Sequence, residues 1–332
     1  MDLPLESWFA IALALVVGFA LLSKGADWLV LGGAWLARRM GVSALVVGLT
    51  IIAFGTSAPE FVVSAFAAGD GRVELSLGNV LGSNVCNLAL VLGGAAVILP
   101  KILEARLEAR EIFWTLFAVA ATWFAARDGA ITRVEGSLFL LAFAAYNLQL
   151  VFSARSPEKS EELPDGKVSK KVLAVVLGIV GITVGAKLIL DGAVAAADRL
   201  GMPESVVGLT VVALGTSLPE LAAGWKSALH GEADISIGNV VGSNVFNLLG
   251  VLGLVAVIQP LDPAAPGVKD PAGVTLAFDK ALSEDFWVVG GVTVLVLLLP
   301  VLGKGRAGRL KGALLLFAYL GYTAWLIHSR AL

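Results

Sequence analysis

Two stretches of sequence decide the fold: GLTIIAFGTSAPE at residues 48–60 and GLTVVALGTSLPE at residues 208–220. Aligned at an offset of 160 residues, the segments around them are identical at more than half of their positions. A second pair, LGNVLGSNVCN at 77–87 and IGNVVGSNVFN at 237–247, lies in the same register. The chain therefore contains an internal repeat, and its repeated positions include polar and acidic residues as well as packing residues.

The composition excludes a soluble enzyme. Of 332 residues, 58% are hydrophobic and 15% are charged, whereas globular domains carry about 25% charged residues. The net charge of -2 provides no basic excess for nucleic acid, and no obligate protein partner is indicated. The single Cys86 excludes an internal disulfide framework, and two histidines leave little material for an imidazole metal site. We expect no cofactor.

Hydrophobic segments of membrane-spanning length follow one another along the whole chain. A helix needs about 20 apolar residues to cross a hydrocarbon core ~30 Å thick. The first and sixth segments are longer than a perpendicular crossing requires, so we expect them to be strongly tilted. Ten segments qualify, with approximate bounds 7–38, 43–69, 74–99, 107–127, 132–154, 171–199, 203–229, 234–259, 285–303 and 309–328.

The repeat divides these segments into two units of five. A unit with an odd number of spans lies upside down relative to its partner, as in the inverted repeats of many secondary transporters. The sequence therefore predicts an all-α membrane protein of ten transmembrane helices, built as two inverted five-helix repeats with broken central helices. Residues 1–155 form the first repeat, 156–170 a cytoplasmic linker, and 171–332 the second repeat.

The distribution of lysine and arginine predicts the orientation. Basic residues are concentrated in alternate connections, including Arg38 and Arg39 and the stretches near 155–171 and 304–311. Because such residues favour the cytoplasmic side, both termini are expected outside. Asp2 and Glu6 stand where a signal peptide would carry basic residues, which favours a retained first span.

The repeated motifs place acids where a membrane protein rarely carries them. A charged side chain at the bilayer centre costs about 2.5–3.5 kcal/mol on insertion scales, so Glu60 and Glu220 indicate a functional site. Pro59 and Pro219 each lack an N–H and clash with the carbonyl four residues earlier. We therefore expect a helix break beside each glutamate, and such breaks occur where backbone lines a cavity.

Further oxygen donors surround the two glutamates. Calcium takes about six to eight oxygens at roughly 2.3–2.6 Å, sodium accepts a similar cage, and magnesium requires a stricter octahedron. Side chains four residues apart share a helix face, which joins the serine and asparagine of each G-S-N-x-x-N motif. The candidate donors are Thr56, Ser57, Ser83, Asn87, Thr216, Ser217, Ser243 and Asn247.

Some of these polar residues have structural alternatives. Faces rich in small residues also serve close helix packing, and Asn79 and Asn239 could be either ligands or hydrogen-bonding partners between helices. Charged residues inside the two long spans are expected to form local ion pairs because of their spacing. These pairs are Lys24 with Asp27 and Lys187 with Asp191.

With its doubled G-T-S-x-P-E and G-S-N-x-x-N motifs, the sequence resembles the cation/calcium antiporter superfamily, in particular the compact prokaryotic members of its sodium/calcium exchanger branch. The resemblance implies a prokaryotic plasma (inner) membrane protein with four central ion sites, in which the two long spans slide across the other eight. It implies that Glu60 and Glu220 coordinate Ca²⁺ and that the carbonyls of Ala53 and Ala213 contribute. It further implies Na⁺ sites formed by Thr56, Ser57, Ser83, Asn87, Thr216, Ser217 and Ser243.

One position departs from the pattern of some relatives, which carry an aspartate where this chain has Asn247. The departure removes a third acid and argues against potassium co-transport. The expected function is electrogenic Ca²⁺ export in exchange for Na⁺ by alternating access. A proton-coupled or sodium-independent cation exchanger is the alternative. A cation channel is less favoured, because channels commonly place such ligands on an axis between subunits.

Overall fold

The computed structural model describes most of the chain, and this part is helical with no β-strand. Predictions that fall on the central linker and on the start of the 203–229 segment lie partly outside the described residues. The described ranges are 7–104, 107–152, 166–200, 213–269, 271–299 and 307–331.

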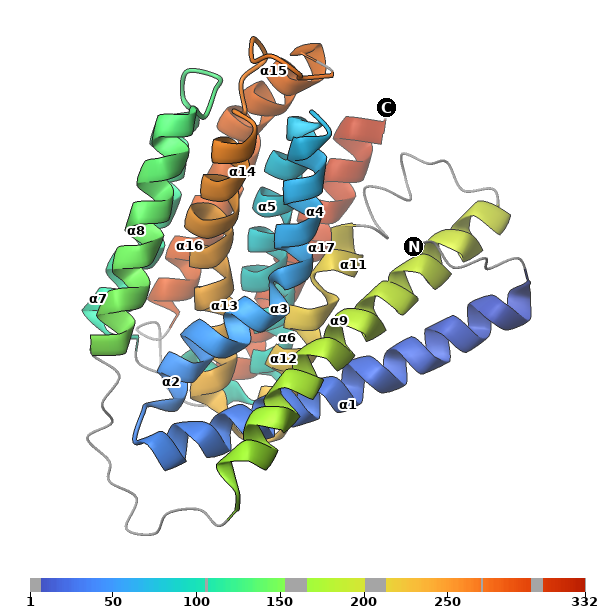
Figure 1. The fold of residues 1–332 in the computed structure, drawn as a ribbon, viewed down its shortest axis with the longest axis vertical. Helices are drawn as coiled ribbons and strands as arrows, with labels where there is room; N and C mark the ends of the chain where they lie inside the picture. The colour runs from blue at the N-terminus through green and yellow to red at the C-terminus, as the bar shows by residue number, and fades with distance from the viewer. Residues whose placement is uncertain are drawn as a thin grey trace.

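Two long helices run obliquely beside the remaining bundle (Figure 1). They are α1 (Trp8–Met40) and α9 (Val168–Arg199), of 33 and 32 residues. They pack antiparallel and close together: a Cβ added at Gly25 would lie 2.7 Å from the Ile182 nitrogen and 2.8 Å from the Gly178 carbonyl oxygen. The expected long first and sixth segments are therefore present as a pair, and their tilt in the membrane stays a prediction.

The rest of the first half contains two interrupted helices and two plain ones. Pro100 opens a short 3₁₀ turn, η3 (Pro100–Glu104), that follows the second interrupted helix. The first interrupted helix comprises α2 (Ala44–Val47), η1 (Gly48–Ile52), α3 (Ala53–Thr56) and α4 (Ala58–Gly69), and the second comprises α5 (Val73–Val85), η2 (Cys86–Val91) and α6 (Leu92–Ile98). The plain helices are α7 (Ala109–Ala126) and α8 (Arg133–Phe152).

The second half repeats these local structures. The π-helical turns η2 and η5 begin at residues 86 and 246, which correspond at the repeat offset. Its helices are α11 (Ala213–Thr216), α12 (Leu218–Leu229), α13 (Ala233–Val245), η5 (Phe246–Val251), α14 (Leu252–Ile258), α15 (Pro271–Lys280), η6 (Ala281–Asp285), α16 (Phe286–Leu298) and α17 (Ala307–Ala331).

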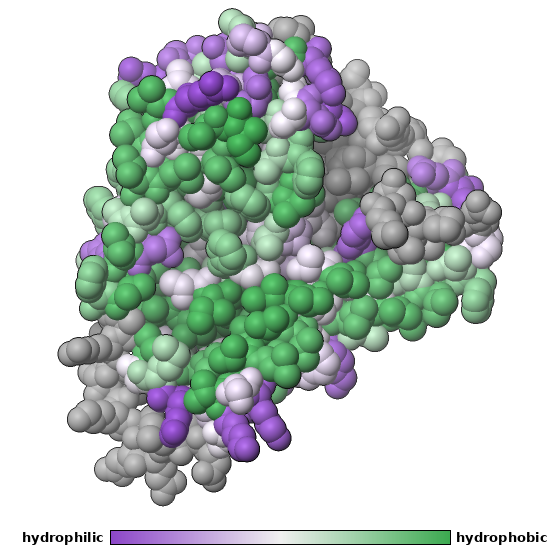
Figure 2. All heavy atoms as spheres, viewed as in Figure 1, coloured by the Kyte–Doolittle hydropathy of each residue, from purple (hydrophilic) through white to green (hydrophobic). Residues whose placement is uncertain are grey.

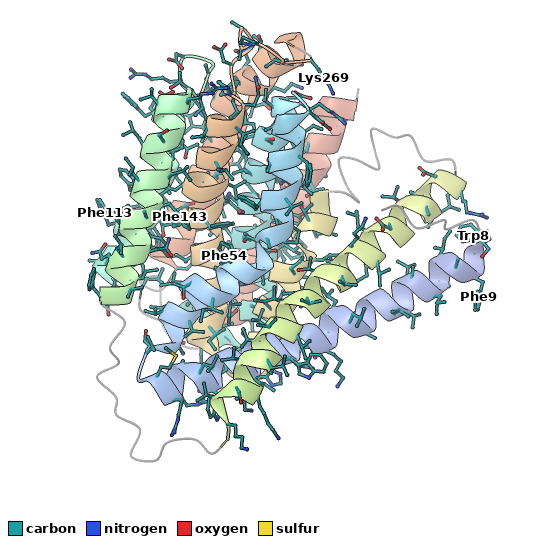
Figure 3. The ribbon with its side chains drawn as sticks, in the orientation of Figure 1. Trp8, Phe9, Phe54, Phe113, Phe143 and Lys269 are labelled. Carbon is teal, nitrogen blue, oxygen red and sulfur yellow. The ribbon has the colours of Figure 1, made fainter. Side chains whose placement is uncertain are left out.

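Length and composition support a membrane-spanning protein. Six described helices are long and apolar enough to cross a bilayer, or seven if the bent pair Ala44–Thr56 and Ala58–Gly69 is one span. The number of ten crossings therefore stays a prediction. Figure 2 shows hydrophobic residues covering the middle of the visible face, with hydrophilic residues gathered at its upper and lower margins. Trp8 and Phe9 project outward at the far end of α1 (Figure 3), as lipid-facing side chains would.

The centre of the bundle consists of the two spans that carry the G-S-N-x-x-N motifs. In an apolar 18-residue window of each helix, 78% of the residues are buried in Val73–Ile98 and 83% in Ala233–Ile258, compared with 33% in α1. The interrupted helices of the G-T-S-x-P-E motifs pack against them. A Cβ at Gly238 would lie 2.6 Å from the Leu45 carbonyl oxygen, and one at Gly242 would lie 2.5 Å from that of Leu49. Glycine thus lets the two halves approach backbone to backbone beside the candidate site.

Candidate ion-binding site

The two glutamates follow breaks in their helices. Ser57, with φ -84° and ψ 8°, separates α3 from α4, and the chain bends by 47° there. Ser217 has nearly the same backbone angles and separates α11 from α12. Pro59 and Pro219 lie in the first turns of the helices that begin after these serines, positions where proline costs no helical hydrogen bond. The predicted breaks are present.

The breaks bring Glu60 and Glu220 together in the interior. Both residues are fully buried, lie in the first turn of their half-helices, and are close enough to interact electrostatically. The positive end of each half-helix dipole therefore lies near a carboxylate. The Ser57 hydroxyl donates to Glu220 Oε1 at 2.6 Å. The hydroxyl of the mirrored residue, Ser217, is buried without a hydrogen-bond partner.

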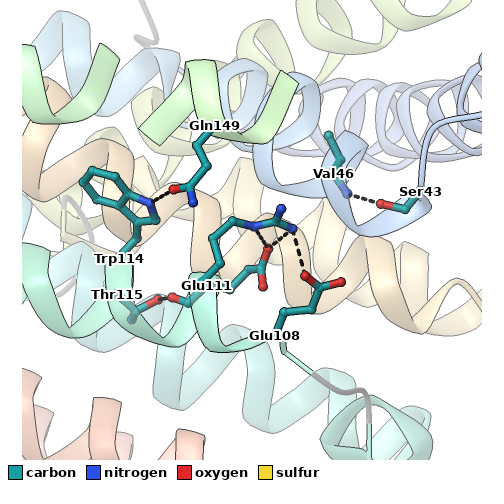
Figure 4. Close-up of polar contacts among 8 residues, drawn as sticks. Ser43, Val46, Glu108, Glu111, Trp114, Thr115 and Gln149 are labelled. Atoms are coloured by element: carbon teal, nitrogen blue, oxygen red, sulfur yellow. Dashed lines mark hydrogen bonds and ion pairs between the residues drawn. The ribbon is translucent and has the colours of Figure 1, made fainter. Parts of the chain in front are cut away.

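Most of the carboxylate oxygens lack a partner. Both oxygens of Glu60 and Oε2 of Glu220 are buried without a hydrogen bond, and no described lysine, arginine or histidine pairs with either acid. A buried charge is costly unless it is paired. Glu111 is equally buried but is neutralised by an ion pair: the Arg110 guanidinium lies 2.6 Å from its Oε1 (Figure 4). The central pair thus has the chemistry of a site that a cation completes.

Threonine hydroxyls bridge the two halves symmetrically around this pair. Thr56 Oγ1 donates to Asn239 Oδ1 at 3.1 Å, and Thr216 Oγ1 donates to Asn79 Oδ1 at 3.3 Å. The Asn79 amide nitrogen also donates to Ser64 Oγ at 2.9 Å. Of the two roles left open for Asn79 and Asn239, the structure shows the hydrogen-bonding one: each amide holds a threonine of the opposite half.

The serine and asparagine donors lie on the neighbouring spans. Asn87 and Asn247 each occupy the second position of a π-helical turn, a local geometry often found at functional sites. The Asn87 side-chain oxygen, both amide atoms of Asn247 and the Ser243 hydroxyl are buried without partners. Ser83 Oγ instead donates to the Asn79 carbonyl. The interior therefore contains several unpaired oxygens besides the carboxylates.

The two alanine carbonyls have different surroundings. The Ala53 carbonyl accepts the Ser57 amide at 3.0 Å, so it already has a hydrogen-bond donor. Ala213 is the first residue of α11. Their ligation of ions stays a prediction.

One expected ion pair is wrong, and one is confirmed. Asp27 does not pair with Lys24: its carboxylate lies 3.1 Å from Lys226 Nζ and 2.9 Å from His230 Nε2, both some 200 residues away in sequence. Tertiary packing of α1 against α12 therefore overrides the local spacing. Lys187 and Asp191 do pair, at 3.0 Å.

Sequence reasoning also missed two buried residues, Asn84 and Asn244. The Asn244 amide nitrogen donates to the backbone carbonyl of Asn84 across the two halves at 3.3 Å. Both residues stand between the serine and the last asparagine of G-S-N-x-x-N. Asparagine occurs at this position in both repeats, within a motif expected to face the interior, and this is the signal that could have pointed to them.

Comparisons with known proteins identify the family of this chain. The family model for "Sodium/calcium exchanger protein" matches residues 10–152 and 170–328. The chain is 36% identical over 325 residues to the putative antiporter CaxA of Alkalimonas amylolytica, covering 95% of this chain and 98% of the relative. It is 28% identical over 358 residues to the sodium/calcium exchanger MaX1 of Methanosarcina acetivorans, covering 95% and 98%.

A solved structure matches the whole fold. The sodium-calcium exchanger NCX_Mj, soaked with Na⁺ and Ca²⁺, superimposes with a TM-score of 0.77 at 30% identity, covering 95% of this chain and 97% of that one. Fold and relatives define a membrane-embedded antiporter of cations. The chain belongs to the sodium/calcium exchanger family.

Proposed function

We propose that this protein exchanges Ca²⁺ for Na⁺ across the membrane, with the ions bound between the two halves at Glu60 and Glu220. The observation that carries the proposal is the fully buried acid pair, with which no lysine, arginine or histidine of the described ranges forms an ion pair. The names of MaX1 and NCX_Mj support sodium and calcium as the transported ions. The unpaired oxygens of Asn87, Ser243 and Asn247 suit hard cations.

Competition for the same carboxylates couples the two fluxes. One Ca²⁺ matches the charge of two carboxylates, and a group of Na⁺ ions occupies the same oxygens in its place. Protons compete as well, because two acids held together repel each other when no cation lies between them. If three Na⁺ enter for each Ca²⁺ that leaves, one net charge moves per cycle. The free energy of exchange then changes by about 2.3 kcal/mol for each 100 mV of membrane potential.

Alternating access follows from two inverted repeats that share one site. In this proposal residues 1–155 and 171–332 form the repeats, 156–170 is the cytoplasmic linker, and both termini lie outside. The relative YrbG of Escherichia coli is named an inner membrane protein, which supports a prokaryotic inner membrane for this chain. The helices α1 and α9 then move together across the bundle, because their backbones are in direct contact.

Flux in proteoliposomes tests the proposal. Sodium-loaded vesicles diluted into sodium-free medium are expected to take up ⁴⁵Ca²⁺, and collapse of the sodium gradient with an ionophore is expected to stop uptake. Potassium and proton gradients are imposed separately. Calcium uptake that follows the proton gradient and ignores sodium would replace the proposal with a proton-coupled exchanger. Single-channel currents far above transporter turnover would replace it with a cation channel.

A further inference from the structure

A chain of amide hydrogen bonds joins the two halves beside the candidate ion site. The Asn244 nitrogen donates to the backbone carbonyl of Asn84 at 3.3 Å, and the Asn87 nitrogen donates to the Asn244 side-chain oxygen at 3.1 Å. All three residues are buried. None of the roles given above to the site residues uses Asn244.

Donor and acceptor chemistry sets the direction of this chain. A backbone carbonyl only accepts, so the group that Asn244 turns toward Asn84 must be its NH₂ group. Its oxygen then faces Asn87, which must in turn present its own NH₂ group. The Asn87 oxygen is left on the opposite side, and it is buried without a hydrogen bond.

We propose that Asn244 is a positioning residue that orients the Asn87 amide so that its oxygen, and not its nitrogen, faces the bound cation. The proposal rests on the proposed function, because Asn87 matters only if the site holds ions. It gives Asn244 the role that outer-shell hydrogen bonds have around metal ligands, whose loss typically costs about 10- to 100-fold in affinity.

The test measures ⁴⁵Ca²⁺ binding to the purified full-length protein. Asn244→Ala is expected to weaken binding about tenfold or more. The informative variant is Asn87→Asp, since a carboxylate presents oxygen in either orientation. In the Asn244→Ala background, Asn87→Asp is expected to restore most of the Ca²⁺ affinity. In the presence of Asn244, the new carboxylate at position 87 would face the Asn244 side-chain oxygen, so the single variant Asn87→Asp is expected to bind Ca²⁺ less well than the double variant. The control is Asn147→Ala, because the Asn147 amide nitrogen donates to the Phe143 carbonyl of its own helix and makes no other hydrogen bond among the described residues.

The outcomes separate positioning from structural support. If Asn244 only supports packing, Asn87→Asp cannot rescue Asn244→Ala, and the inference is overturned. Normal Ca²⁺ binding by Asn244→Ala also overturns the inference while the proposed function stands. If the unmodified protein binds no Ca²⁺, the proposed function fails first. If Asn244→Ala does not fold, Asn244→Ser takes its place, because the serine hydroxyl cannot make both hydrogen bonds of the Asn244 amide.

A second, independent observation concerns charges outside the site. Asp27 on α1 contacts Lys226 and His230 near the end of α12, and Arg38 lies 3.2 Å from Glu232. These contacts join α1 to the bundle at the end where both helices are predicted to reach the cytoplasm. Among the described residues no ion pair joins α9 to the C-terminal end of α4, and the two ends lie apart (Figure 1).

The repeat supplies complementary charges at the mirrored positions of two of these three contacts, whereas Lys226 corresponds to the uncharged Phe66. There, Lys187 and Asp70 have opposite charge, as do Asp198 and Arg72. In the described part of the chain Lys187 pairs with Asp191 of its own helix, while Asp70, Arg72 and Asp198 are exposed and form no ion pair. At the offset of 160 residues, Asp27 corresponds to Lys187, His230 to Asp70, Arg38 to Asp198, and Glu232 to Arg72.

We infer that these are two alternative sets of ion pairs: the observed set closes the cytoplasmic end, and the mirrored set closes the outer end when α1 and α9 shift. This inference also rests on the proposed alternating access. Both sets act on the long helices, so each stabilises one orientation of the same moving pair, and formation of one set requires release of the other.

Charge reversal tests contact between partners that are apart in this structure. Asp198→Arg and Arg72→Asp are each expected to slow exchange about two- to fivefold, as an exposed ion pair allows, and the double reversal is expected to restore it. Arg38→Glu with Glu232→Arg is the reference for an observed pair. Lys24→Gln, an exposed charge on α1 with no described ion pair, is expected to leave the rate unchanged.

Disulfide trapping provides a readout that needs no ion flux. Asp198→Cys with Arg72→Cys is expected to cross-link in membranes under oxidising conditions, leaving the buried Cys86 unreacted. A double reversal no faster than the slower single variant, or no cross-link in folded protein, would overturn the inference. Cross-linking in a protein that transports neither ion would support the movement and count against the proposed function alone.

Discussion

Replacement of Glu60 by glutamine should stabilise the ion-free protein while abolishing its response to calcium. Glu60 is fully buried and both of its oxygens lack hydrogen bonds. A second acid, Glu220, lies within electrostatic range. Glu60→Gln removes one of two repelling charges without changing the volume of the side chain. Most substitutions of buried residues destabilise, so an increase in stability is a distinctive expectation.

The magnitude follows from the removed charge, because the glutamine amide still places two polar atoms at the positions of the unpaired carboxylate oxygens. A buried polar atom without a partner costs about 1–3 kcal/mol, and more when it is charged. We therefore expect Glu60→Gln to raise the free energy of unfolding by about 1–3 kcal/mol without ions. Glu220→Gln should raise it less, because Ser57 already donates to Glu220 Oε1.

Addition of calcium should reverse the order of stability. A ligand at 100 times its Kd stabilises the protein that binds it by about 2.7 kcal/mol. The unmodified protein should gain this amount, and Glu60→Gln should gain little. Unfolding of detergent-solubilised protein, followed by the fluorescence of its 8 tryptophans at about pH 8, compares calcium with a sodium-free chelator buffer.

The matched control is Glu111→Gln. Glu111 is buried like Glu60 but pairs with Arg110 at 2.6 Å, so its neutralisation should destabilise the protein by up to about 3–5 kcal/mol and leave the calcium response intact. A Glu60→Gln variant that is less stable than the unmodified protein without ions, or that keeps the full calcium response, would refute the reasoning.

Three further predictions follow from the same contacts. Acidification from about pH 8 to pH 6 should raise the KM for calcium, because protons compete for the two carboxylates; a KM constant over this range in proteoliposomes would count against that competition. Gly25→Val should destabilise the protein by about 1–3 kcal/mol through overpacking of α1 against α9, as measured by unfolding, whereas Gly69→Ala has open space and should be tolerated. Asn247→Asp places a third acid among unpaired atoms, so its calcium uptake should fall more steeply on acidification than that of the unmodified protein.

Much of the candidate site could be predicted from sequence, because each signal was local and occurred twice. Proline next to Glu60 and Glu220 removes a backbone donor, so the helix had to break near the acid wherever the segment lay. The long apolar segments that became α1 and α9 were recognisable from length alone. The duplicated motif also predicted that both acids belong to one site, since two units with an odd number of spans each would be inverted against one another.

Only the tertiary structure decided which groups meet. The spacing of Lys24 and Asp27 fits a local ion pair, but α12 brings Lys226 and His230 to Asp27 instead. The orientation of the Asn87 amide depends on Asn244, which belongs to the other half. Sequence by itself determined the types of donor and the helix breaks, because these depend on covalent chemistry and on neighbours within a few residues. Partners across the interface between halves depend on the packing of whole helices, where small residues such as Gly238 and Gly242 set the distance of approach.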